Sequence, residues 1–109
     1  MKTYIEVKTS IEGFHNYPDA PEIVSFLSNR HRHIFVVIVR LLVKHDNREK
    51  EIFIEKKRIE DLLEKKFGYP CEFGEMSCEM IAKYVLKNTS GAVSCKVLED
   101  GEGGAVVYV

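Results

Sequence analysis

The chain has 109 residues, with 16 Lys and Arg against 17 Asp and Glu, so its formal net charge is -1. The length predicts one domain over residues 1–109, and the balanced charge gives no reason to expect nucleic acid or a membrane as a partner. No apolar run approaches the length of about 18 residues that a membrane-spanning helix needs. Three cysteines without paired spacing argue against a disulfide framework and favour a reducing, cytoplasmic location.

The N-terminal part of the chain predicts a strand, a loop and a short helical turn. Residues 2–12 alternate strictly between apolar and polar side chains, which is typical of a half-buried strand and unlike a secretory signal. Residues 16–22 contain two prolines and predict a loop. A short helical turn over residues 23–27 follows.

A second strand is expected over residues 31–45, which are rich in Val and Ile. Residues 46–48 (Asp-Asn-Arg) favour a hairpin turn. Residues 51–54 are then expected to form the returning strand or to continue the hairpin.

The next part of the chain predicts two helices and two further strands. Residues 56–67 place apolar side chains at helical spacing, and Ser77 is a suitable N-cap for a second helix. Residues 92–99 alternate again, and residues 105–109 close the chain as a last strand. The order β-β-α-α-β-β predicts an α+β fold, with a four-stranded antiparallel sheet and both helices on one face.

Histidines lie at the ends of the predicted apolar faces. Side chains alternate across a strand, so the odd-numbered face of the first strand leads to His15 and that of the second begins with His31 and His33. A meander of these strands would bring all three together. Three imidazoles match the protein ligands of a zinc site with one open position. The alternative is that the histidines only satisfy local hydrogen bonds.

Four short segments, in order along the chain, resemble motifs of the 6-pyruvoyltetrahydropterin and 6-carboxytetrahydropterin synthase family, the latter acting in the queuosine pathway. Residues 11–15 (IEGFH) resemble its Phe-x-Ala-x-His motif, and residues 31–33 (HRH) resemble its His-Gly-His. Residues 76–79 (MSCE) resemble its Pro-Thr-x-Glu, and residues 97–100 (VLED) its Val-x-Glu-Thr. The resemblance implies the tunnelling fold of that family.

The resemblance also implies a site. It implies a zinc ion on the three histidines and a Glu99 carboxylate that accepts paired hydrogen bonds from a pterin or purine-like ligand. It places Ser77, Cys78 and Glu79, at the start of the second helix, near that ligand. It implies a homo-oligomer, a trimer or hexamer, with the ligand between subunits.

In that family a cysteine between the first two histidine motifs acts as the base, supported by an Asp-His pair after the first helix. This chain has no direct counterpart of either. No cysteine lies between His15 and His31, and no Asp-His pair follows the first predicted helix. Cys78 is the candidate replacement, because a helix N-terminus lowers the pKa of a thiol; the alternative is a buried structural side chain. The expected function is therefore a zinc-dependent, lyase-type enzyme acting on a pterin or purine-like ligand. A non-catalytic protein that binds the same metal and ligand is the alternative.

Overall fold

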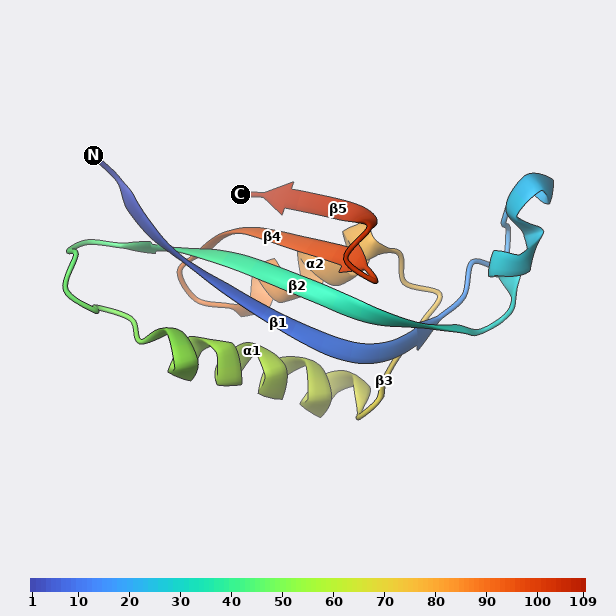
Figure 1. Ribbon diagram of the computed structural model, residues 1–109, viewed down its shortest axis with the longest axis horizontal. Helices are drawn as coiled ribbons and strands as arrows, with labels where there is room; N and C mark the ends of the chain where they lie inside the picture. The colour runs from blue at the N-terminus through green and yellow to red at the C-terminus, as the bar shows by residue number, and fades with distance from the viewer.

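The computed structural model describes residues 1–109 and contains five strands, two α-helices and one short 3-10 helix (Figure 1). In chain order these elements are β1 (Thr3–His15), η1 (Glu22–Ser28), β2 (His31–Val43), α1 (Ile52–Phe67), β3 (Cys71–Gly74), α2 (Cys78–Asn88), β4 (Ala92–Glu99) and β5 (Gly103–Tyr108). None of the helices combines the length and apolar character that crossing a membrane requires. The predicted α+β class is confirmed.

The strands form one sheet in the order β3-β1-β2-β4-β5. Strands β1 and β2 are antiparallel over their whole length, as the predicted meander requires, and β4 and β5 continue the antiparallel pairing. The sheet has five strands where four were predicted, because β3 adds to the outer edge of β1 in the parallel direction.

Odd-numbered side chains of the long strands build the core. Pairs such as Val7 with Val39 and Ile11 with Phe35 lie opposite each other in the register of β1 and β2, and all four are buried. Both helices contribute to the same apolar cluster, through Ile59 and Leu63 of α1 and through Ile81, Ala82 and Val85 of α2. The helices therefore cover one face of the sheet, as predicted.

Residues 52–54 form the first turn of α1, so the predicted strand over residues 51–54 is wrong. The Glu51 side chain accepts hydrogen bonds from the amides of Phe53 and Ile54, which caps the helix one turn earlier than the apolar spacing indicates. Ile52, Phe53 and Ile54 are exposed in this first turn. These three large apolar residues have the composition that is typical of a strand, which explains the wrong prediction.

Strand β3 was not predicted, because four residues are too few to display a period. Cys71 is the first residue of this strand and is fully buried. Phe73 is buried on the same side, and the intervening Glu72 is exposed. The strand is important for the site, because its C-terminal end lies beside His15.

Candidate metal centre

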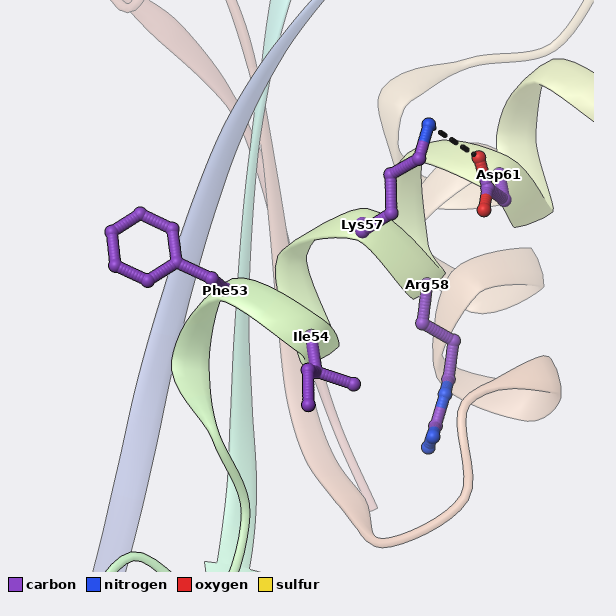
Figure 2. Close-up of a pocket in the computed structure, with 5 residues that line it drawn as sticks. All are labelled: Phe53, Ile54, Lys57, Arg58 and Asp61. Carbon is purple, nitrogen blue, oxygen red and sulfur yellow. Dashed lines mark ion pairs between the residues drawn. The ribbon is translucent and has the colours of Figure 1, made fainter.

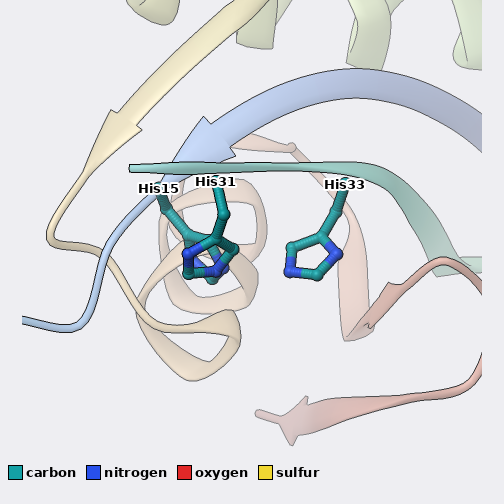
Figure 3. Close-up of side chains that lie close together, drawn as sticks. All are labelled: His15, His31 and His33. Atoms are coloured by element: carbon teal, nitrogen blue, oxygen red, sulfur yellow. The ribbon is translucent and has the colours of Figure 1, made fainter. Parts of the chain in front are cut away.

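The pairing of β1 with β2 brings the three histidines together at one end of the sheet. His15 is the last residue of β1 and lies opposite His31, the first residue of β2, while His33 lies opposite Gly13. Ring centroids are 4.6 Å apart for His15 and His31 and 4.9 Å apart for His31 and His33. One nitrogen from each ring lies within 4.8 Å of the others. Figure 3 shows the three rings on the same side of the two strands.

Each of the three rings has its Nδ1 held by an acceptor. His15 Nδ1 lies 2.9 Å from the Met76 carbonyl oxygen, and His31 Nδ1 lies 2.8 Å from the Asn29 carbonyl oxygen. A carbonyl oxygen can only accept, so both Nδ1 atoms carry the proton and donate it. This tautomer leaves the Nε2 lone pair of each ring free, which is the arrangement of metal-binding histidines.

The third ring, His33, donates to a carboxylate. Its Nδ1 lies 2.7 Å from Asp100 Oδ2, and the other Asp100 oxygen accepts from the amide of Ile34 at 2.9 Å. These hydrogen bonds, first from the amide and then from the imidazole, lower the pKa of Asp100. Asp100 has a φ of 55°, so the chain turns immediately after β4 and directs this carboxylate back to β2.

Two Nε2 atoms remain without a hydrogen-bond partner. Those of His15 and His33 are both buried from solvent, and neither forms a hydrogen bond within the protein. Buried polar atoms are normally satisfied, so two neighbouring unpaired nitrogens fit the donors of a metal site. A transition-metal ion accepts lone pairs from imidazole nitrogen, and the three histidines together can hold such an ion.

Glu99 lies beside the imidazoles. Its Oε2 is 3.0 Å from His15 Nε2, and its Oε1 is 3.6 Å from His33 Nε2. It lies opposite Phe35 in the pairing of β2 with β4, on the face that the alternation of β4 predicts. The carboxylate therefore directly adjoins the proposed metal ligands, in addition to lining the neighbouring cavity.

Aromatic side chains form the floor of the cluster. The Phe35 ring lies edge-on to His15 and His33, with centroids 5.1 and 5.6 Å away, and also contacts Phe73 of β3. Gly13 leaves room for these rings, because a Cβ at this position would lie 2.7 Å from Phe73 and 3.0 Å from Phe35. His15 and His33 thus pack against a buried aromatic side chain.

A cavity of about 540 Å³ opens next to the cluster. His15, His31 and Glu99 line one part of it, and Ser77 and Glu79 line another. Its size falls within the range of about 300–1,000 Å³ that is usual for small-molecule sites. The structure thus brings the start of α2 and the end of β4 to the same cavity.

The residues at the start of α2 have different surroundings. The Ser77 hydroxyl oxygen accepts from the amide of Met80 and caps the helix, as predicted, while the Glu79 side chain is exposed in the first turn. Cys78 is buried, and its Sγ lies 3.6 Å from Glu99 Oε2. Burial, followed by the neighbouring Glu99 charge, raises the pKa of Cys78 to about 12. This direction is opposite to the one expected from the helix terminus, because desolvation of the thiolate outweighs the dipole.

The remaining cysteines and the fourth histidine lie outside the cluster. Cys71 and Cys95 are fully buried and free, and burial raises their pKa values to about 11 and about 12. His45 is exposed near the turn after β2, 3.9 Å from Glu49.

A second hollow lies on α1 and shares no residue with the histidine cavity. Figure 2 shows its lining, with Phe53 and Ile54 in the first turn and an ion pair of 3.0 Å between Lys57 and Asp61. Its side chains are exposed and contain no metal-ligating cluster. It therefore offers no chemistry comparable with that of the histidine end.

Sequence reasoning missed the groups that orient the imidazoles. The carbonyls of Met76 and Asn29 are backbone atoms, so no residue type could have indicated them. Asp100 belongs to the VLED segment, but the alternation of β4 cannot place a residue that follows the strand at positive φ. An acidic residue directly after Glu99 at the histidine end of the sheet was the available signal.

Comparison with known proteins shows a shared fold. No protein-family model and no curated protein sequence matches the chain. The solved structure of Caenorhabditis elegans 6-pyruvoyl tetrahydropterin synthase is similar, with a TM-score of 0.63 and 16% identity over 100% of this chain and 96% of that one. An uncharacterized protein from Wolinella succinogenes has a TM-score of 0.68 and 14% identity over 99% and 98% of the two chains. The chain therefore has the tunnelling fold of 6-pyruvoyl tetrahydropterin synthase.

Proposed function

We propose that the protein binds a zinc ion through His15, His31 and His33 and acts on a pterin or purine-like ligand in the adjoining cavity. The observation that carries this proposal is the set of three Nδ1 hydrogen bonds, which direct free Nε2 lone pairs to one place. Two of these nitrogens are buried without a partner. Imidazoles held in one tautomer by carbonyl and carboxylate acceptors are typical of metal ligands.

Zinc is the proposed metal because three neutral imidazoles and an open position are a common catalytic zinc environment. When bound, it would polarise oxygen atoms of the ligand side chain and so ease removal of a neighbouring proton. The protein contributes the orientation of the rings, a cavity that shields the ligand, and the carboxylate of Glu99.

The ligand class follows from the polar groups that line the cavity and from the shared fold. In the proposal, the Glu99 carboxylate accepts hydrogen bonds from an amino-substituted heterocycle, since a carboxylate pairs well with two parallel N–H groups. The Ser77 oxygen accepts from Met80, so its O–H remains available to donate to the ligand. Glu79, which is exposed at the rim, supplies a second acceptor.

Two functions use these groups, a lyase-type enzyme and a non-catalytic binding protein. Cys78 lines the cavity and is the candidate proton-transfer group of the enzyme. Its raised pKa keeps the thiol protonated at neutral pH, so it fits the donor role more readily than the base role. We favour the enzyme, because a metal with an open position next to a cavity usually serves chemistry.

We further propose a cytoplasmic homo-oligomer, a trimer or hexamer, in which subunits meet at the edges of the sheet. Strand β5 is an edge strand with Val106 and Tyr108 exposed on it. Unpaired edges of this kind readily accept a strand from another chain. Light scattering coupled to size-exclusion chromatography tests this assembly, and a monomer at micromolar concentration would contradict it.

Calorimetry with zinc-loaded protein tests the ligand proposal. Reduced pterins, deazaguanines and purines form the panel, and at least one class should bind to the wild type and fail to bind to Glu99→Ala. Binding that is unchanged in Glu99→Ala would contradict the anchor role. Incubation of the same compounds distinguishes the two functions: product formation that is lost in Cys78→Ser supports the enzyme, and binding without any product supports the binding protein.

A further inference from the structure

Glu99 faces the proposed metal ligands and no other charged partner. Its two oxygens lie 3.0 Å from His15 Nε2 and 3.6 Å from His33 Nε2, and these are its only ion-pair contacts. No Lys or Arg side chain pairs with it. A carboxylate that is 35% exposed would normally turn to water or to a basic side chain, so its position against two imidazoles needs a cause.

A direct hydrogen bond between Glu99 and an imidazole does not explain this position of the carboxylate. The Nδ1 atoms carry the ring protons, so the Nε2 atoms present lone pairs to the carboxylate. Even with a second proton on the ring, His15 Nε2 would form no hydrogen bond here, because Oε2 lies within reach but out of line with the N–H direction. Lone pairs and a negative charge in contact repel each other unless a cation lies between them.

The spacing fits donors that share one cation. Two donors on a tetrahedral zinc ion, each at the usual bond length, lie about 3.3 Å apart. Glu99 approaches this spacing with a different oxygen at each ring, since Oε2 lies 3.0 Å from His15 Nε2 and Oε1 lies 3.6 Å from His33 Nε2. The off-line geometry is also expected, because donors to one ion point at the ion and not at each other.

Neighbouring groups hold the carboxylate in this position. The Cys78 thiol lies 3.6 Å from Glu99 Oε2 and can donate to it. On the other side, the backbone of Asp100 is fixed by a hydrogen bond to the Ile34 carbonyl at 2.8 Å, which aligns the end of β4 with β2. The fixed backbone and the thiol contact therefore favour the observed position of the Glu99 carboxylate.

We propose that Glu99 is the fourth ligand of the bound metal in the ligand-free protein. This inference rests on the proposed metal site and adds a residue to it. The carboxylate would then hold the fourth position, which the proposed function gives to the ligand. A ligand that takes this position would displace Glu99, whose carboxylate could then pair with it.

Cobalt(II) in place of zinc makes the coordination visible by absorption spectroscopy. In the wild type, the visible bands should be those of a four-coordinate ion and should change little when azide, a small anionic ligand, is added. In Glu99→Ala the position is open, so azide should change the spectrum at concentrations at least about tenfold lower. Cobalt affinity should also fall by at least the roughly 10- to 100-fold that is typical for loss of an outer-sphere partner.

Two further variants keep this test decisive. Glu99→Gln preserves the shape of the side chain and removes the charge, so it should also alter the cobalt spectrum while circular dichroism shows an unchanged fold. Glu75→Gln changes another carboxylate of the same cavity that contacts none of the histidines and should match the wild type. Equal spectra and equal azide response in wild type and Glu99→Ala would overturn the inference alone. A wild type that binds no cobalt would overturn the metal site itself.

Discussion

The carboxylate of Asp100 accepts a hydrogen bond from His33 Nδ1 across 2.7 Å, which makes His33 the one imidazole of the cluster that is oriented by a charged group. The rings of His15 and His31 donate to backbone carbonyls instead. A carboxylate on the far nitrogen strengthens an imidazole as a metal donor and fixes its orientation. Asp100 therefore acts as a positioning residue for the proposed site.

Replacing Asp100 with Ala should lower zinc affinity by about 10- to 100-fold, because His33 would lose its orienting partner. Competition with a chromogenic chelator measures this change. Asp100→Asn is the companion variant, because its single amide oxygen can accept from His33 Nδ1 or from the Ile34 amide but not from both, and Asn tolerates positive φ. It should recover part of the affinity, and an equal loss in both variants would show that a single neutral acceptor cannot replace the carboxylate.

A methyl group at Gly13 should disturb the packing of Phe35 and Phe73 next to the histidines. In Gly13→Ala the new Cβ would lie 2.7 Å from Phe73 and 3.0 Å from Phe35, and both rings are buried and tightly packed. We expect a loss of about 1–3 kcal/mol in the free energy of unfolding, together with weaker metal binding. Urea denaturation measures the first effect. Gly103→Ala is the control, because nothing lies within 4 Å of a Cβ there.

The three cysteines should be unreactive in the folded protein. Burial raises the pKa values of Cys71, Cys78 and Cys95 to about 11, about 12 and about 12, so almost no thiolate exists at pH 8. A thiol reagent should modify none of them rapidly until denaturant is added. Fast modification of Cys78 in the native state would show that its thiol is activated.

The raised pKa values of the buried cysteines make the stability of the fold depend on pH. A thiol that is harder to ionise in the folded state stabilises the fold fully below the unfolded pKa of about 8.5. This contribution is lost as the pH rises toward the folded values of about 11 to 12. The free energy of unfolding should therefore decrease above about pH 9, and the decrease should be smaller in Cys95→Ala.

Much of the fold follows from alternation in the sequence. Most odd-numbered side chains of the three long strands are buried as predicted, and the pairing of His15 with His31 follows from the meander of the first two strands. The first turn of α1 was predicted as a strand, because its residues favour a strand by composition. The N-cap at Glu51 makes this segment helical instead. Strand β3 depends on its contact with β1, which no local pattern indicates.

The site was predictable only in part. Alternation along the strands is enough to place three imidazoles and Glu99 on one face at one end of the sheet. It does not reveal how close Glu99 comes to His15, because that distance depends on the register of β4 with β2. It also does not reveal the orienting role of Asp100, which depends on a turn at positive φ after the last strand residue.

Metal content is the most direct test of the central claim that the three histidines form a metal site. Protein purified without chelators and reconstituted with zinc should hold about one zinc per chain by mass spectrometry of the metal. His33→Ala should lose it, whereas His45→Ala, which changes the exposed histidine outside the cluster, should retain it. A folded wild-type protein that holds no more zinc than His33→Ala would contradict the account.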